Sequence, residues 1–233
     1  MNRSKRVLSV IGLGVLLGTA NLLAQSSATD IAKKAYDYLD HQEKYAFDAV
    51  NRSHFGKDMT KHQISVEVDR PDHLRTDVRG DVRNRTTYLN NGIYTIYDHD
   101  KNMYTNIKVP KGIDGALDKL YEKYQVSMPL AQLLYKHMGN RMKRGYRSKN
   151  FGIVDLNGEK CNYIAFSDRY KEVHVWISAS DKPLIKHFVV KDKVKNNNTY
   201  NEATIVWRDS KSISSSDFLF KKPKNAVEVF LDK

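Results

Sequence analysis

The sequence has few of the residues that restrict the conformation of a chain, with one cysteine and five prolines in 233 residues. Because Cys161 has no second cysteine to pair with, the chain forms no internal disulfide, and its stability must come from packing. Cys161 lies in the alternating run CNYIAF. That setting predicts a small buried hydrophobic residue rather than a reactive thiol.

Motifs for catalysis and for cofactor binding are also missing. The eight histidines are scattered, and no His-Glu-x-x-His pattern or Cys/His cluster has the spacing of a zinc site. No serine lies in a nucleophile elbow, and no glycine-rich loop opens a helix after a strand. The sequence therefore predicts a protein that is not an enzyme and has no catalytic residue, metal site or cofactor. A hydrolase with a scattered site is kept as an alternative.

The first 24 residues have the layout of a secretory signal peptide. A short basic run precedes an apolar run from Val7, and small residues follow at Ala20, Ala24 and Ala28. An N-terminal membrane anchor is the alternative, but the glycines and polar residues within the run make it a poor spanning helix. We expect cleavage after Ala24, which leaves residues 25–233 as a single soluble domain in the periplasm.

Most of the remaining chain alternates apolar and polar residues with the period of two that β-strands have. The run Ile64 to Val68 alternates in this way, and Arg70-Pro71-Asp72 separates it from the similar run Leu74 to Val78. Asn90-Asn91-Gly92 predicts a hairpin turn, because Asn and Gly tolerate positive φ. About ten short antiparallel strands are expected on this basis.

Three segments change to helical periodicity. Thr29 or Asp30 can cap a first helix that ends near Leu39, and a second helix runs from Ile113 to Tyr124. A third helix is expected after Pro129, over LAQLLYKHMGNRMK. Its apolar stripe predicts a core face, with a mobile lid as the alternative. Helices inserted among so many strands predict an α+β, mainly β fold in which one large curved sheet wraps around helices.

The hairpin from Val173 to Lys193 carries large apolar residues on both faces. If Ile177 pairs with Leu184, then one face holds Val173, Val175, Ile177, Leu184, Phe188 and Val190. The other face then holds His174, Trp176, Ile185, His187 and Val189. A sheet with one face in water needs only one apolar face. The face with Trp176 therefore predicts cover from a helix or from a ligand.

The chain is strongly basic, with 39 Lys and Arg residues against 27 Asp and Glu residues and a formal net charge of +12. Arg75, Arg79, Arg83 and Arg85 have strand spacing. In a cytosolic protein this pattern would indicate nucleic acid. The export signal argues against nucleic acid and favours peripheral contact with anionic lipid headgroups, or an acidic protein partner. An ordinary solvated basic face is the alternative.

The order of several segments resembles a family of predicted periplasmic proteins of unknown function with a LolA/LppX-like, lipoprotein-carrier fold. The matching segments run through nearly all of the chain: RPDHLR, NNGIYTIYD, KNMY, MPLAQLL, LNGEKCNYIAF, VHVWIS, DKPLIKHFVV, ATIVW and DFLFKKPKNAVEV. The resemblance implies a strongly curved antiparallel sheet that forms an open half-barrel, with helices covering an apolar concave face. Relatives of this fold carry lipoproteins or other acylated molecules between membranes.

The two-faced hairpin and the resemblance together predict a carrier or binding protein for a lipid or lipidated protein, which holds an acyl chain in the half-barrel as a monomer. Cavities of this kind are mostly apolar. The candidate lining residues are Phe166, Trp176, Phe188 and Trp207 from strands, and Leu130, Leu133, Leu134 and Met138 from helices. The alternative is a ligand-free cell-envelope interaction or assembly factor that acts through its surface.

Overall fold

The computed structural model describes residues 26–141, 146–194 and 199–231. The expected signal peptide, residues 1–24, lies outside this part of the chain and stays a prediction. The described residues form one sheet in the order β12-β6-β5-β4-β3-β2-β1-β11-β10-β9-β8-β7. All neighbouring strands are antiparallel except β12 and β6.

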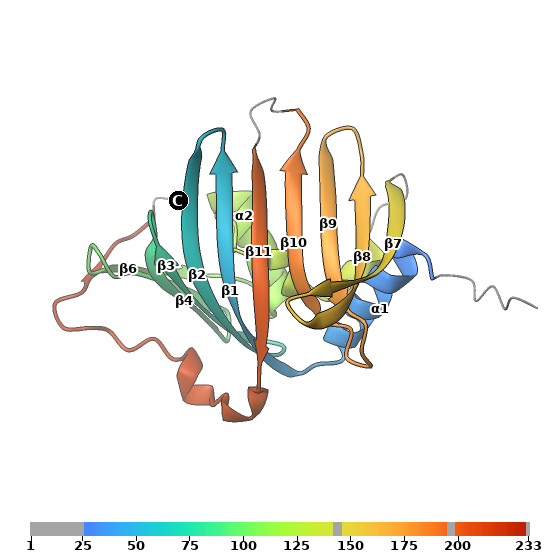
Figure 1. Cartoon of the computed structure of the whole chain (residues 1–233). Coiled ribbons are helices and arrows are strands. Elements are labelled where there is room, and N and C mark those ends of the chain that lie inside the picture. Colours follow the sequence, from blue (N-terminus) through green and yellow to red (C-terminus); the bar gives the residue numbers. More distant parts are fainter. Residues whose placement is uncertain (1–25, 142–145, 195–198, 232–233) are drawn as a thin grey trace, which may run out of the picture.

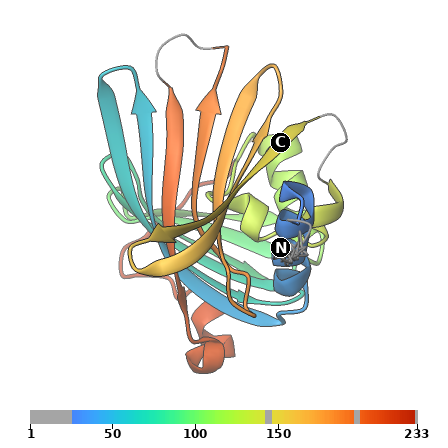
Figure 2. The same ribbon diagram turned by 45° about the vertical axis from the view of Figure 1, so that its right-hand side comes forward.

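The sheet is open and strongly curved, with helices on its concave side (Figures 1 and 2). The predicted mainly β fold is therefore confirmed. The strands are β1 Lys44–Phe55, β2 Asp58–Asp69, β3 His73–Gly80, β4 Asn84–Asn90, β5 Ile93–Asp98, β6 Met103–Lys108, β7 Arg147–Leu156, β8 Glu159–Ser167, β9 Lys171–Ser178, β10 Ile185–Asp192, β11 Tyr200–Arg208 and β12 Val227–Glu228.

Two longer helices cover the concave face, α1 (Ala28–Asp40) and α2 (Ile113–Tyr124). The cap of α1 is Ser27, whose hydroxyl accepts the N–H of Asp30 at 3.1 Å, and not Thr29 or Asp30 as expected. Thr29 and Asp30 already lie inside the first turn. A Ser side chain just before that turn satisfies an amide that has no partner within the helix.

The expected third helix is replaced by two short pieces, the 3₁₀ turn η1 (Ala131–Leu133) and α3 (Met138–Arg141). The prediction of one continuous helix was wrong because Leu130 and His137 adopt positive φ, 59° and 56°. A residue in the left-handed region ends the right-handed helical path. The segment contacts both helices, since the N–H of Lys136 donates to Asp114 of α2 and the N–H of His137 donates to Asp40 of α1.

The main core lies between the concave face and these helices. Alternation along β2 and β3 buries one side of each strand, including Ile64, Val66, Val68 and Leu74. Helix α2 places its buried face on the same cluster through Ile113, Ala116, Leu117 and Leu120. Burying a side chain of this size contributes about 1.5–3 kcal/mol.

The convex face is covered only in part by the described residues. After β11 the chain passes through η2 (Ser210–Ser212) and η3 (Ser215–Phe218), where Ile213 and Phe218 pack on Ala46. It then reaches β12 beside β6. This thin outer layer lies over the β1–β6 half of the sheet, whereas β7 to β10 have aromatic side chains on their convex face.

Candidate ligand cavity

A cavity of about 460 Å³ lies between the concave face of β8, β9 and β10 and the segments α1, η1 and α3. Its volume is in the range of about 300–1,000 Å³ that small-molecule sites occupy. Most lining side chains are apolar. The lining residues are Ala32, Tyr36, Gln132, Leu133, Met138, Tyr146, Phe166, Lys171, Val173, Val175, Ile177, Ile185, Phe188 and Val190.

The sheet side of the cavity follows from the two-residue period of β9 and β10. Phe188 lies opposite Val175, and Val190 lies opposite Val173. A bulge between Ile185 and His187 then places Ile185 opposite Ile177. The expected register, with Ile177 opposite Leu184, was therefore wrong along the hairpin: beyond the bulge Trp176 pairs with His187 and His174 with Val189, two residues away from the expected partners. A shift of two residues leaves those side chains on their expected faces, whereas the bulge turns Ile185 to the other face. Ile185 faces the cavity and not the convex side.

Hydrogen bonds from Tyr45 and Arg70 hold η1 over the cavity. The Tyr45 hydroxyl donates to the Leu133 carbonyl oxygen at 2.8 Å. The Arg70 Nη2 donates to the Tyr45 hydroxyl at 3.0 Å and to the Leu134 carbonyl oxygen at 2.8 Å. We call these groups of Tyr45 and Arg70 the η1 clamp. Because the clamp comes from β1 and from the turn after β2, it connects η1 to the sheet. We call η1 and α3, which lie over the cavity, its roof.

The roof is also held at its other end. The Asp40 carboxylate accepts the N–H of His137 at 2.9 Å. Gly139 lies so close to α1 that a Cβ there would meet Lys33 and Tyr36 side-chain atoms at 3.4 Å. This close approach lets α3 pack on α1 and brings Met138 to the cavity wall.

Polar groups are few, and the exposed ones lie at one end of the cavity. Burial raises the pKa of Tyr36 to about 12, so its phenol stays neutral. Among the described lining residues only Tyr146 and Lys171 are exposed. Lys171 is the first residue of β9, and Tyr146 directly precedes β7. The mouth of the cavity is therefore at the end of the sheet where these two strands begin.

The structure brings four of the eight candidate residues to the cavity: Phe166, Phe188, Leu133 and Met138. Leu130 and Leu134 are buried in the core beside it. Trp207 packs on Phe47 with ring centroids 5.2 Å apart, and its Nε1 donates to the Ile185 carbonyl oxygen at 2.8 Å. These three residues support the roof and the neighbouring core and are not among the cavity-lining residues.

Trp176 does not face the cavity, so its assignment as a lining residue is corrected. It lies between Val175 and Ile177, which do line it, and side chains alternate along a strand. On the convex face Trp176 stacks on Tyr163 with centroids 4.5 Å apart, and Tyr163 stacks on Phe151 at 4.4 Å. His187 packs edge-on against Trp176 at 4.9 Å. Neighbouring side chains therefore supply the cover expected from a helix or ligand.

Sequence reasoning missed the valines of β9 and β10 and the α1 residues Ala32 and Tyr36 as lining residues. The alternation placed Val173, Val175, Phe188 and Val190 together on one face, which the structure confirms. It gave no sign of which face is concave. The aromatic content of the other face favoured the wrong choice.

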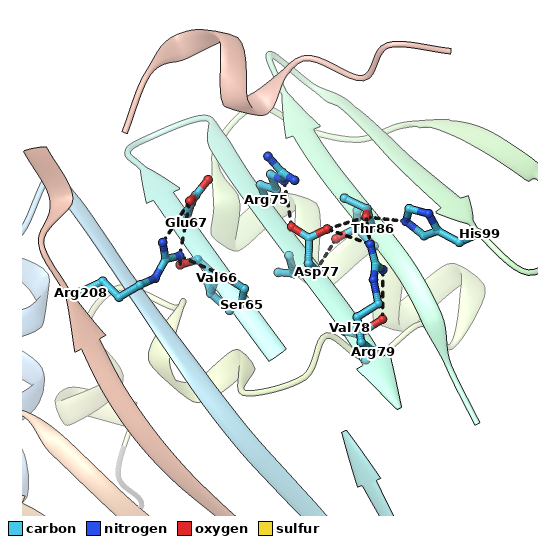
Figure 3. Close-up of polar contacts among 12 residues, drawn as sticks. Ser65, Val66, Glu67, Arg75, Asp77, Val78, Arg79, Thr86, His99 and Arg208 are labelled. Carbon is cyan, nitrogen blue, oxygen red and sulfur yellow. Dashed lines mark hydrogen bonds and ion pairs between the residues drawn. The ribbon is translucent and has the colours of Figure 1, made fainter. Parts of the chain in front are cut away.

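A second, outer groove of about 410 Å³ crosses the convex face of β3, β2, β1 and β11. Figure 3 shows the polar contacts beside it: the Arg208 guanidinium donates to Ser65 Oγ at 3.0 Å and lies 3.4 Å from the Glu67 carboxylate. The Asp77 carboxylate lies 2.9 Å from Arg75 Nε and accepts the Thr86 hydroxyl at 2.6 Å. These carboxylates are paired with guanidinium groups, which is an arrangement typical of a structural sheet surface.

Metal-ligating clusters and membrane-spanning helices are both absent from the described ranges, residues 26–141, 146–194 and 199–231. In that part of the chain, no group of three His, Cys, Asp or Glu side chains is placed to hold a metal ion. None of its helices is both long enough and apolar enough to cross a membrane.

The fold is shared with solved proteins of low sequence identity. An uncharacterized conserved protein from Thermus thermophilus aligns with a TM-score of 0.51 and 11% identity, over 87% of this chain and 98% of that one. MucB aligns with a TM-score of 0.50 and 11% identity, over 83% of this chain and 62% of MucB. The Mycobacterium tuberculosis lipoprotein LppX has a TM-score of 0.46 and 8% identity, over 80% of this chain and 97% of LppX.

MucB from Pseudomonas aeruginosa has also been solved in a complex with MucA. No curated protein sequence matches this chain. A family model described as "Predicted periplasmic protein (DUF2092)" matches residues 28–231. The expected family, fold and compartment are thus confirmed: the chain belongs to the DUF2092 family of periplasmic proteins.

Proposed function

We propose that this protein is a periplasmic binding or carrier protein that holds the acyl chain of a lipid or lipidated protein in the cavity under α1 and η1. The observation that carries the proposal is the cavity of about 460 Å³, whose wall is formed mainly by valine, isoleucine, leucine, methionine and phenylalanine side chains. A site lined in this way favours an apolar ligand over a polar one.

The free energy of such binding comes from removing the chain from water. Each buried CH₂ group contributes about 0.8 kcal/mol. Burial of only part of one acyl chain therefore offsets the free-energy cost of association and leaves a net favourable free energy of binding. Lys171 at the mouth is the one cation among the described lining residues, and it suits an anionic group at the end of the ligand.

We further propose that the protein is not an enzyme. The ligand cavity has a buried neutral phenol and an amide but no carboxylate or imidazole among its described lining residues. The carboxylates at the outer groove are paired with arginines. A carrier needs neither a nucleophile nor a general base.

An envelope interaction factor is the second candidate, and one observation favours it. MucB, which shares this fold, has been solved with a bound partner protein, MucA. This chain also has side chains available for such a contact, since Phe151 is 42% exposed and Ile153 is 62% exposed on β7 at the sheet edge. In that case the cavity would be a passive part of the fold.

Two adjacent valines of β10 make a matched test of the cavity. Val190 lines the cavity, whereas Val189 points to the opposite face, and both are half-buried. We expect Val190→Trp to fill the cavity and to weaken binding of a fluorescent long-chain fatty acid by at least about tenfold, because several CH₂ groups of the fatty acid can then no longer be buried in the cavity. Val189→Trp should bind the probe as the wild type does.

Val173→Trp provides a second filling variant, since Val173 lies opposite Val190 on the same wall. Unfolding curves establish that each variant is folded before binding is measured. Equal affinity of all three variants and the wild type would contradict the cavity assignment. Loss of binding in Val189→Trp alone would place the ligand on the convex face.

A further inference from the structure

Three hairpin ends lie side by side at the end of the sheet where the cavity opens. They are the β1–β2 turn, the β8–β9 turn and the described parts of the β10–β11 connection (Figure 1). The N–H of Lys193 donates to the Tyr170 carbonyl oxygen at 2.8 Å, which joins the second and third ends. The His54 and Tyr200 rings stack with centroids 4.1 Å apart, which joins the first end to β11.

Each of these ends exposes apolar side chains. Phe55 is 52% exposed, Met59 50%, Tyr170 47% and Val194 66%. A single exposed apolar residue is ordinary on a protein surface. Several gathered on adjacent turns at one end of the fold indicate an interaction site.

Cations stand beside these apolar side chains. Lys57 lies between Phe55 and Met59, Arg169 is next to Tyr170, and Lys193 is next to Val194. The Arg169 guanidinium lies over the Tyr170 ring, 4.3 Å from its centroid. We call these four apolar and three cationic residues the mouth rim.

Asp58 lies beside Lys57 in the β1–β2 turn, and two other carboxylates near the rim fix the turns. Asp168 accepts the N–H groups of Tyr170 and Lys171 at 2.7 and 2.6 Å. Asp192 accepts the N–H of Val194 at 2.9 Å. With Glu172, which lies opposite Lys191, the described β8–β9 and β10–β11 ends carry three acids against Arg169, Lys171, Lys191 and Lys193, an excess of one positive charge.

We propose that the mouth rim docks on an anionic lipid bilayer, with its apolar side chains in the interfacial region and its cations among the headgroups. Aromatic and apolar side chains beside Lys and Arg are the combination that binds at a membrane surface without spanning it. Each cation near such a surface adds electrostatic attraction to the anionic headgroups. The inference rests in part on the proposed function, because docking at this end brings the cavity mouth to the source of an acyl chain.

The test is flotation of the mature protein with vesicles. Vesicles of equal parts phosphatidylcholine and phosphatidylglycerol should bind it, and phosphatidylcholine vesicles should bind it far less. We expect the double variant Lys57→Glu/Arg169→Glu to lose at least about tenfold in affinity for the anionic vesicles. The variant Phe55→Ser/Val194→Ser should lose binding that persists at high salt, since its apolar contribution is not screened.

Matched control variants carry the same kinds of substitution at positions outside the mouth rim. Ile153→Ser/Val206→Ser changes two side chains that are 62% and 63% exposed on other parts of the surface. Lys108→Glu/Lys111→Glu changes the charge near the opposite end of the sheet, where Lys108 pairs with Ile93. Both controls should bind vesicles as the wild type does.

Equal losses in rim and control variants would overturn the proposal, because the protein would then bind through its overall charge. Absence of vesicle binding by the wild type would also overturn it and would favour an acidic protein partner at this end. Fatty-acid retention measured on the same preparations separates the two proposals. Rim variants that keep the fatty acid but lose the vesicles support the rim, whereas a wild type that binds vesicles but no fatty acid refutes only the cavity function.

Discussion

Removing one buried hydroxyl tests whether the roof of the cavity is held as the structure indicates. In Tyr45→Phe the ring stays in the core, where Tyr45 is 4% exposed, and only the hydroxyl of the η1 clamp is lost. The Leu133 carbonyl oxygen loses its 2.8 Å donor and Arg70 loses one of its two acceptors. Each net hydrogen bond contributes about 0.5–1.5 kcal/mol, so we expect a destabilisation of about 1–3 kcal/mol.

Urea denaturation measures this loss in the free energy of unfolding. For a domain of this size each kcal/mol corresponds to about 2–4 °C in Tm. Hydrogen exchange localises the effect, because the N–H groups of Leu134 and Tyr135 donate to the Ala131 carbonyl oxygen within the clamped segment. These amides should exchange faster in Tyr45→Phe.

Tyr97→Phe is the matched control. Its hydroxyl donates to Asn102 Oδ1 at 2.9 Å in the β5–β6 hairpin, far along the sheet from η1. It should lose a comparable single hydrogen bond without faster exchange at Leu134 or Tyr135. A Tyr45→Phe protein within about 0.5 kcal/mol of wild type, with unchanged exchange at these amides, would refute the clamp.

Three residues of the sheet, His187, Cys161 and Gly80, allow further tests. Burial lowers the pKa of His187, so the imidazole is protonated in the unfolded chain before it is protonated in the folded protein as the pH falls. The wild-type Tm should therefore decrease when the pH is lowered from about 7.5 to about 5.5, and it should decrease less in His187→Asn. An equal decrease in both proteins would contradict this. Burial raises the pKa of the Cys161 thiol, so a thiol reagent should label it only in denaturant, and rapid labelling of the native protein would contradict its burial. A Cβ on Gly80 would overlap the Lys61 carbonyl oxygen, so urea denaturation of Gly80→Ala should show a decrease of about 1–3 kcal/mol in the free energy of unfolding. A denaturation curve equal to that of the wild type would show that β2 and β3 move apart there at little cost.

The strands could be predicted because their side-chain period is local. Alternation in Ile64–Val68 and Leu74–Val78 and the Asn90-Asn91-Gly92 turn each fix a strand or hairpin without reference to the rest of the chain, and the structure has them. Helix α2 followed in the same way from its apolar stripe.

The roof and the orientation of the wall could not be predicted from local pattern. Leu130 and His137 adopt positive φ, so the first residue of the expected helix lies outside helical geometry and His137 interrupts it. The inward and outward faces of β9 depend on the curvature of the whole sheet, so Trp176 was placed on the wrong side. The bulge that turns Ile185 inward has no sequence signature in the hairpin.

The carrier function is best tested by mass spectrometry of an organic extract from the protein purified out of its native periplasm, beside the Val190→Trp variant prepared in the same way. We expect one acyl-containing lipid at close to one molecule per protein in the wild type, and little or none in the variant. A wild-type extract without lipid, in a protein that also fails to bind a fluorescent fatty acid, would contradict the carrier function. An equal lipid content in both preparations would show that the lipid is held outside the cavity.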